Sequence, residues 1–245
     1  MSSIGQAAML VSVPVVAAGV GSTVAVLRPP SSRVVSGVQH FAAGVVIAAL
    51  AGEVLPDLKA EGSRGWAVLG FSAGVILMLA LAAYGRRVDA RRAQVAKASV
   101  AIAPVGLLAA VAVDLLVDGA LVWLGSTLGA AQGLIITAAL TIEVLFLGLS
   151  VAGELTQLGM NRLKATLTCW VLGLLTAVGA LGAVVLLDGA PTAALATVLA
   201  FGAAALLYLA VEELLVYAHE ERETVWLSAL FFIGFLLVYA LAQEA

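Results

Sequence analysis

The chain has 245 residues, of which 63% are apolar and 11% are charged, with a formal net charge of −3 and a mean hydropathy of +1.13. A soluble domain has roughly 45–50% apolar and about 25% charged residues, so the composition excludes a soluble globular protein. The apolar runs are continuous, which excludes a transmembrane β-barrel, whose strands alternate in segments of about ten residues.

Eight apolar runs are long enough to cross a hydrocarbon core of about 30 Å. In chain order they cover residues 7–27, 35–57, 66–85, 99–124, 132–158, 166–187, 192–217 and 225–243. Charged residues, Gly and Pro separate them, as at residues 28–33 and 188–191. The sequence therefore predicts an all-α polytopic membrane protein with eight transmembrane helices, forming a single transmembrane domain over residues 1–245.

The basic residues predict the orientation. Ten of the twelve Lys and Arg residues fall in the loops after spans 1, 3, 5 and 7, and five of these lie in a short basic loop at residues 86–98. Basic loops stay on the cytoplasmic side, so we expect both termini on the extracytoplasmic side. The loop at 86–98 is too short to form the folded basic surface that nucleic-acid binding needs, and we expect it to face anionic lipid instead.

Spans 2 and 7 contain a weak internal repeat. Phe41 precedes Glu53 by twelve residues, and Phe201 precedes Glu213 by the same spacing. Because the two spans run in opposite directions, the pattern predicts an inverted repeat of spans 1–3 and 6–8 around spans 4 and 5. Such repeats are typical of transporters with a binding site at the repeat interface. Chance similarity between apolar segments is the alternative.

The middle spans carry buried acids. Asp114 and Asp118 are one turn apart on a single face of span 4, and Glu143 lies near the middle of span 5. Carboxylates at membrane depth are costly and face the bundle interior or a wet cavity. No Lys or Arg falls inside the apolar runs. The partner of these acids is therefore a proton, a mobile cation or nothing, and we predict a metal site; protonated acids that join helices by hydrogen bonds are the alternative.

Further acids follow the predicted membrane depth. Glu53 and Asp57 lie toward the outer end of span 2, Glu154 toward the cytoplasmic end of span 5, and Glu212 and Glu213 toward the inner end of span 7. We expect these five residues to line the entrance or the exit path of the predicted site.

Stretches in four of the predicted spans resemble the ZIP (Zrt/Irt-like) metal transporters. Residues 41–45 (FAAGV) and 53–56 (EVLP) are similar to the family's FAAGV followed by HLLPE. Residues 114–119 (DLLVDG) resemble its HNxxDG, and residues 143–152 (EVLFLGLSVA) resemble its H/Q-x-x-P-E-G-L-A-V-A. Residues 207–221 (LYLAVEELLVYAHEE) resemble its LYxALxELLPEAHEE. The resemblance covers nearly the whole chain and implies the eight-span ZIP fold.

The resemblance also implies a binuclear metal centre between spans 4 and 5, but this chain departs from the ligand pattern. The family's span 4 His is Asp114, its first span 5 ligand is Glu143, and its span 5 motif acid is Leu147. Asp118 keeps the second acid of span 4, and the span 6 acid is missing near Thr176. This leaves one all-carboxylate site, which favours Mn²⁺, Fe²⁺ or Mg²⁺ over Zn²⁺, although zinc also accepts carboxylate oxygen.

The sequence therefore favours a divalent metal cation transporter of a bacterial inner membrane, working in the uptake direction. We expect it not to be an enzyme and to need no cofactor beyond the transported ion. Its expected partners are the divalent ion and the lipid bilayer, and a homodimer is compatible with the sequence. Two alternatives stay open: a proton-coupled solute transporter, and a ZIP-like fold that has lost transport and acts as a sensor or partner subunit.

Overall fold

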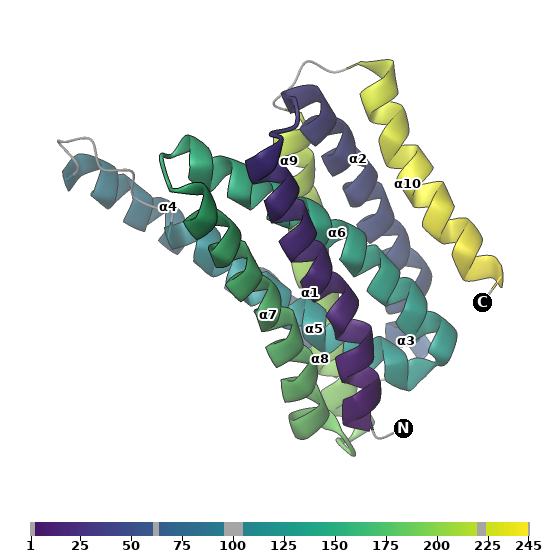
Figure 1. Ribbon diagram of the computed structural model, residues 1–245. Helices are drawn as coiled ribbons and strands as arrows, with labels where there is room; N and C mark the ends of the chain where they lie inside the picture. Colours follow the sequence, from purple (N-terminus) through teal and green to yellow (C-terminus); the bar gives the residue numbers. More distant parts are fainter. Residues whose placement is uncertain (1–2, 61–63, 96–104, 220–223, 245) are drawn as a thin grey trace.

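The computed structural model describes residues 3–60, 64–95, 105–219 and 224–244, and helix is the regular secondary structure throughout these ranges (Figure 1). Among the described residues, seven helices are long and apolar enough to cross a membrane, and a shorter apolar helix spans Val225–Leu241. The prediction of an all-helical, multi-pass membrane protein is confirmed.

Most predicted spans correspond to one helix, while spans 2 and 7 are each divided into three segments. In chain order the elements are α1 (Ser3–Leu27), α2 (Ser32–Ala49), η1 (Leu50–Val54), α3 (Leu55–Ala60), α4 (Arg64–Val95), α5 (Val105–Leu128), α6 (Ala130–Gln157), α7 (Arg162–Leu187), α8 (Thr192–Tyr208), η2 (Leu209–Leu214), α9 (Leu215–Ala218) and α10 (Val225–Glu244). The segments η1 and η2 are π-helical.

The π-helical segments were not predicted from the sequence. Pro56 follows η1 by two residues; proline has no backbone N–H and its ring clashes with the carbonyl group four residues before it, so regular α-helical bonding is disrupted at this place. Position 216, at the corresponding place after η2, holds Val, so proline does not explain the second segment. Short π-helical segments occur often at functional sites.

The predicted loop at residues 86–98 is helical as far as its described part extends. Helix α4 continues to Val95 and so includes Arg86 and Arg87. The stretch from Arg86 to Val95 contains no Gly or Pro and is rich in Ala and Arg, which favour helix. The end of the predicted loop and the predicted start of span 4, residues 96–104, lie outside the described residues.

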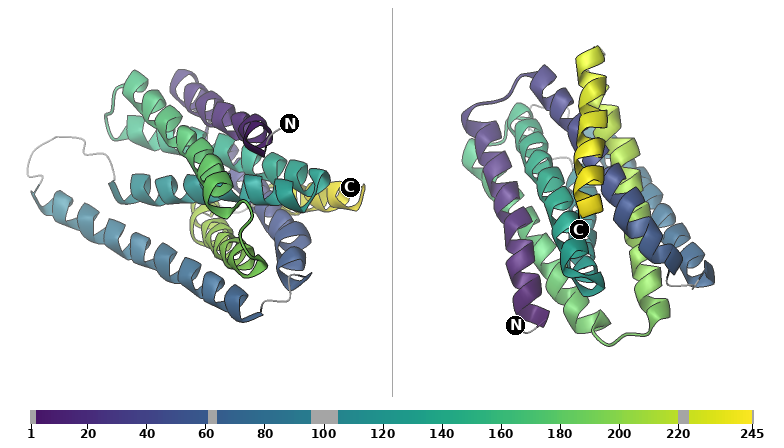
Figure 2. Two further views of the ribbon diagram at one scale, coloured as in Figure 1. Left: turned by 90° about the horizontal axis from the view of Figure 1, so that it is seen from below. Right: turned by 90° about the vertical axis from the view of Figure 1, so that its right-hand side faces the viewer.

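The helices form two groups. In the first group, α1 packs along α6 and α7, and α5 packs along α7 and α6. In the second, α2 packs against α10, and α4 packs against α8. The contacts of α2 with α6 and of α4 with α5 join the groups and are less extensive. The left view of Figure 2 shows α4 at the periphery, diverging from the other helices toward its C-terminal end.

Glycines bring the backbones together inside each group. An added Cβ on any of eight helical glycines would meet a carbonyl oxygen of a neighbouring helix at 1.9–2.8 Å. In the first group the glycine–carbonyl pairs are Gly21–Leu145, Gly119–Thr176, Gly148–Ala18 and Gly179–Leu116. In the second group they are Gly44–Phe231, Gly70–Thr197, Gly74–Phe201 and Gly234–Phe41. Gly202 faces the other group and instead meets the side chain of Leu121. Backbone contact therefore occurs within the groups, and side chains fill the space between them.

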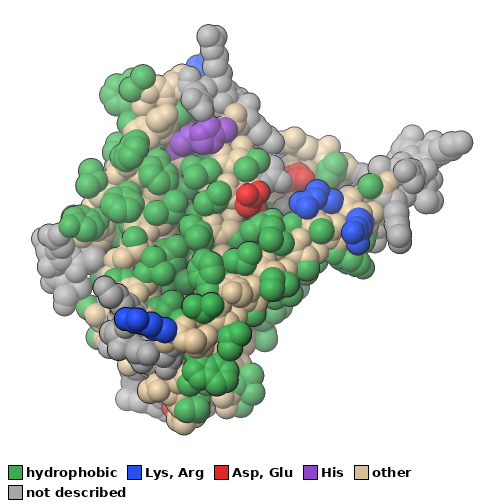
Figure 3. Space-filling model, turned by 180° about the vertical axis from the view of Figure 1, so that it is seen from behind, with side chains coloured by type: hydrophobic (Ala, Val, Ile, Leu, Met, Phe, Trp, Pro, Cys, Tyr) green, Lys and Arg blue, Asp and Glu red, His purple; other side chains and the backbone are tan. Residues whose placement is uncertain are grey.

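The outer surface is apolar, as a lipid-facing surface must be. Hydrophobic side chains cover most of the face shown in Figure 3, where charged groups are few. Exposed large apolar residues are found on most helices, for example Val185 and Leu186 on α7 and Phe232 on α10. In Figure 1 the N-terminal end of α1 and the C-terminal end of α10 both point downward, while the turn between α1 and α2 lies at the top.

Candidate metal centre

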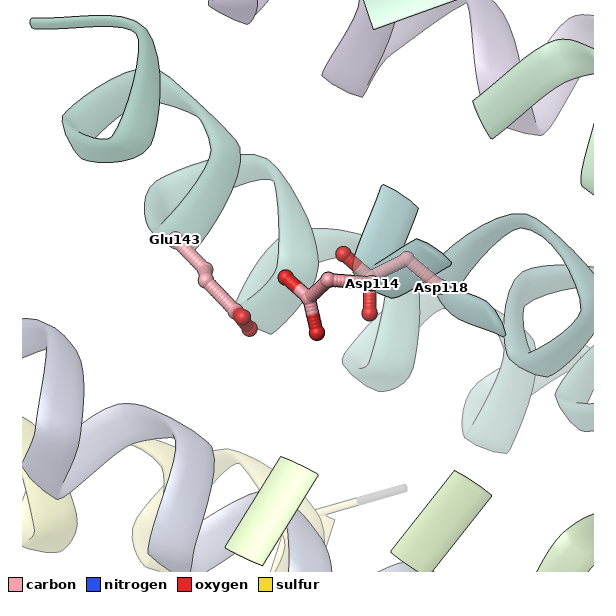
Figure 4. A group of neighbouring side chains, drawn as sticks. All are labelled: Asp114, Asp118 and Glu143. Atoms are coloured by element: carbon pink, nitrogen blue, oxygen red, sulfur yellow. The ribbon is translucent and has the colours of Figure 1, made fainter. Parts of the chain in front are cut away.

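Helices α5 and α6 bring three carboxylates together about midway along their length. Asp114 and Asp118 extend from successive turns of α5, and Glu143 extends from α6. The three side chains are 1%, 0% and 0% exposed, and one oxygen atom of each lies within 4.8 Å of those of the other two. Figure 4 shows the carboxylates pointing toward one another. We call these residues the carboxylate trio.

The carboxylate trio receives no hydrogen bond from the described residues. Both side-chain oxygens of Asp114, Asp118 and Glu143 are buried, and none of them has a hydrogen-bond partner in the described part of the chain. Transferring an isolated ionised carboxylate into a medium of low dielectric costs on the order of tens of kcal/mol. Their charge must therefore be neutralised, either by protons or by a cation.

The geometry of the trio suits a hard divalent cation. Such ions bind carboxylate oxygens at about 2.0–2.6 Å, so two oxygens on opposite sides of an ion are about 4–5 Å apart. The oxygens of the trio all lie within 4.8 Å of one another, which is close enough for one ion to contact all three. Three oxygen ligands with no nitrogen or sulfur favour Mn²⁺, Mg²⁺ or Fe²⁺ over softer ions.

Two neighbouring cavities lead away from the trio. The smaller, of about 40 Å³, is lined by polar residues Gln39, Glu143, Ser150, Glu154 and Glu213, together with apolar side chains. The larger, of about 550 Å³, includes Gln39, Ser150 and Glu154 in its wall as well. It extends to Pro29 and Pro30 in the connection between α1 and α2. The two cavities share Gln39, Ser150 and Glu154, so polar side chains extend from Glu143 toward the end of the bundle that carries the basic connections.

Of the five acids predicted to line the entrance or the exit path, three have described side chains, and these differ in burial and in whether they reach a cavity. Glu154 is half-buried and lines both cavities, and Glu213, also half-buried, lines the smaller one. Glu212 is exposed and lines neither cavity. The backbones of Glu53 and Asp57 lie in η1 and α3, and their side chains lie outside the described part of the structure.

Two further residues of the site region carry polar groups whose importance the sequence did not reveal. Gln39 of α2 is 4% exposed and lines both cavities. Thr176 of α7 is 0% exposed, and its hydroxyl has no hydrogen-bond partner among the described residues. Its carbonyl oxygen packs against Gly119, the residue after Asp118. The one feature of the sequence that could have identified Gln39 and Thr176 is that each is a polar residue inside an apolar span.

The histidines are not part of the trio. The rings of His40 and His219 lie 5.2 Å apart between their centroids, and each Nδ1 atom is hydrogen-bonded to a carbonyl oxygen of the preceding turn, Ser36 and Leu215 respectively. The Ser36 hydroxyl donates a hydrogen bond of 2.6 Å to the carbonyl oxygen of Ala218, which joins α2 to α9. These contacts hold the two helix ends together away from the carboxylates.

Comparison with known proteins found no match to a protein-family model and no match to a curated protein. The functional interpretation therefore depends on the geometry of the carboxylate trio and of the route that leads from it.

Proposed function

We propose that this protein is a ZIP-like transporter that carries a divalent metal ion across the bacterial inner membrane in the uptake direction. The observation that carries the proposal is the buried carboxylate trio, whose oxygens have no hydrogen-bond partner among the described residues. Ionisable residues inside membrane spans mark ion pathways and binding sites. Asp114, Asp118 and Glu143 would hold the ion. No covalent bond changes, so the protein would not act as an enzyme.

An inverted repeat is supported by contacts that match in the two halves of the chain. Gly74 packs against the carbonyl group of Phe201, and Gly234 packs against that of Phe41. The two glycines are 160 positions apart in the sequence, and so are the two phenylalanines. The π-helical segments η1 and η2 contain Glu53 and Glu213, which are also 160 positions apart. We infer that spans 1–3 and 6–8 are related repeats, as in many secondary transporters.

Among the described residues, the two cavities beside Glu143 extend toward the end with the basic connections. On the other side of the trio, apolar residues of α5, α6 and α8 are packed into the main hydrophobic core, including Leu121, Leu140 and Leu199. If the basic connections face the cytoplasm, this conformation is open inward and closed outward, and both termini are extracytoplasmic.

Alternating access would then arise from movement of the first helix group against the second. Backbone contacts at glycines hold each group together, and the trio belongs entirely to the first group. Side-chain packing between the groups, such as Leu121 against Gly202, would be exchanged during this movement. The oxygen-only ligand set favours Mn²⁺ or Fe²⁺ as cargo, with Zn²⁺ as a weaker substrate.

Transport is tested with the purified full chain in liposomes that contain a metal-sensitive fluorophore. We expect wild-type protein to admit Mn²⁺, Asp118→Asn to abolish the flux, and Glu212→Gln to leave it unchanged. Metal binding without flux in folded protein would refute transport and favour the sensor alternative. Dissipation of a proton gradient with no metal requirement would refute it in favour of the proton-coupled alternative.

A further inference from the structure

The smaller cavity beside the trio lies between the two helix groups. On the side of the first group its wall is formed by α5 and α6, with side chains that include Glu143 and Phe146. On the side of the second group it is formed by Gln39 of α2 and by residues of η2 that include Leu209 and Glu213. The segment η2 itself contacts α2 and α8. The width of the cavity therefore depends on how the two groups are placed relative to each other.

This cavity is long and narrow. Its wall follows α6 from Glu143 to Glu154, which are eleven residues and therefore about 16.5 Å apart along the helix axis. The volume of the cavity is only about 40 Å³. A cavity needs roughly 10–15 Å³ to hold one water molecule, so this one holds about three at most. A divalent ion can pass through it only after losing most of its hydration shell.

The larger cavity, of about 550 Å³, has room for a fully hydrated ion. Three side chains line both cavities and so mark the place where the narrow part ends: Gln39, Ser150 and Glu154. Ser150 and Glu154 are one turn apart on α6. Gln39 is the side chain that the second group contributes at this place among the described residues. An ion that leaves the narrow part therefore passes between Gln39 and α6.

The chemistry of Gln39 suits an ion that has lost water. Its side chain is 4% exposed and is held in the packed wall of both cavities. Amide carbonyl oxygens are ligands for hard cations. Because the amide is neutral, it can replace a water molecule of the ion without holding the ion as tightly as a carboxylate would, and conduction requires binding that is weak enough for release. The neighbouring side chains of the second group at Leu209 and Leu214 offer no oxygen.

We propose that the smaller cavity is a dehydrating constriction and that Gln39 is its specificity-determining residue. The amide oxygen of Gln39 replaces water that the ion loses between Glu143 and the larger cavity. This inference rests on the proposed function, since the ion is the one that the trio holds.

The constriction selects among hard ions by their ease of dehydration. An oxygen-only trio suits Mg²⁺ as well as Mn²⁺, so the trio alone does not separate them. Mg²⁺ dehydrates reluctantly and usually keeps several water molecules in an octahedral shell of about six ligands. That shell exceeds the room in a cavity of about 40 Å³. We therefore expect Mn²⁺ to be transported and Mg²⁺ to be excluded.

The test compares transport with binding on the purified full chain. Initial rates of Mn²⁺ flux into liposomes give kcat and KM, and isothermal titration gives the affinity of the trio. Gln39→Met keeps the length of the side chain and removes the amide. We expect this variant to bind Mn²⁺ with wild-type affinity and to lose at least about tenfold in kcat, which corresponds to about 1.4 kcal/mol in the barrier. Gln39→Glu, which keeps an oxygen at the same reach, should retain most of the flux.

Gln157→Met is the matched control. Gln157 is exposed and lines the larger cavity only, where an ion keeps its water, so this variant should leave kcat and affinity unchanged. Wild-type protein should carry Mn²⁺ and give no flux with Mg²⁺ at the same concentration.

Wild-type kcat in folded Gln39→Met protein, or equal flux of Mg²⁺ and Mn²⁺ in wild type, would overturn the constriction and leave the proposed function intact. Loss of Mn²⁺ affinity in Gln39→Met would also overturn it, because Gln39 would then act on the trio. Equal loss of flux in Gln39→Glu and Gln39→Met would show that the oxygen is not what matters and would overturn it as well. Absence of Mn²⁺ flux in wild type would overturn the proposed function itself.

Discussion

Asp114 and Glu143 occupy equivalent positions on two different helices. A glycine follows each of these acids after five residues and packs against the backbone of a neighbouring helix. Gly119, after Asp114, contacts the carbonyl oxygen of Thr176 in α7. Gly148, after Glu143, contacts the carbonyl oxygen of Ala18 in α1. The carboxylate trio therefore lies where α5 and α6 make matching contacts.

Replacing Asp118 by Asn should abolish metal binding without unfolding the protein. Asn keeps the shape of the side chain but removes the charge of a ligand that is 0% exposed. Loss of a group that merely supports a metal ligand already costs about 10–100-fold in affinity, so we expect a loss of at least about 100-fold for Mn²⁺. Isothermal titration measures the affinity, and near-native affinity in the Asn variant would remove Asp118 from the site.

Replacing Gly119 by Ala should destabilise the bundle at the site. The new methyl group would lie 1.9 Å from the carbonyl oxygen of Thr176, so α5 and α7 must separate. Overpacking of this kind typically costs about 1–3 kcal/mol, and we expect a lower melting temperature in detergent together with weaker metal binding. Gly182→Ala on α7 is the matched control, because nothing lies within 4 Å of its added Cβ. Equal melting temperatures for the two variants would contradict the close helix contact.

Metal affinity should rise with pH. The buried carboxylates have no protein base beside them in the described residues, so in the absence of metal they are neutralised by protons, which a divalent ion must displace. A lower pH therefore favours the proton-bound form and weakens metal binding. We expect the apparent Mn²⁺ affinity to increase from about pH 5 to about pH 8. The Asp118→Asn variant, which has one acid fewer to deprotonate, should show a shallower slope wherever its binding is measurable. A flat profile in wild type would exclude proton displacement.

The helical architecture and the carboxylates at its centre could be predicted from the sequence. The length of an apolar run identifies a transmembrane helix, and an acid inside such a helix normally faces the interior of the bundle. The side-chain directions at the end of span 7 could not. Glu212 and Glu213 are neighbours, yet the first is exposed and the second lines the smaller cavity. Successive residues of a helix point about 100° apart, and the unforeseen π-helical segment η2 changes that register. The sequence therefore could not show which acid faces the site.

Gln39 could not be assigned from the sequence for a different reason. It lies near the start of α2, where a polar side chain is normally solvated, and its place in the cavity depends on the packing of α2 against α6.

Helix α4 illustrates a third limit. A change from apolar to basic composition marks the end of a hydrophobic run, but Ala and Arg continue a helix well, so α4 extends to Val95.

The orientation should be measurable by cysteine labelling in intact cells. Cys169 is buried, and Cys169→Ser provides a background without the native thiol. On this background Thr192→Cys, at the start of α8, should react with a membrane-impermeant maleimide. Arg162→Cys, at the start of α7, should react only after permeabilisation, because its connection is on the basic side. The reverse pattern would invert the proposed orientation and make the polar route an outer entrance.

Replacing Asp114 by His should change metal preference rather than abolish binding. Imidazole nitrogen suits Zn²⁺ better than Mn²⁺, whereas carboxylate oxygen suits Mn²⁺. Asp114 is buried beside Asp118 and Glu143, so a nitrogen ligand at this position would enter the same coordination sphere. We expect the ratio of Zn²⁺ to Mn²⁺ affinity to increase by about tenfold or more, which corresponds to about 1.4 kcal/mol of differential binding. The measurement is competitive binding of both ions to wild type and variant, with Glu212→His as the control for a histidine outside the cavities. If the ratio is the same in the folded Asp114→His variant as in wild type, Asp114 is not a ligand, and the trio is better explained as protonated acids that join α5 to α6.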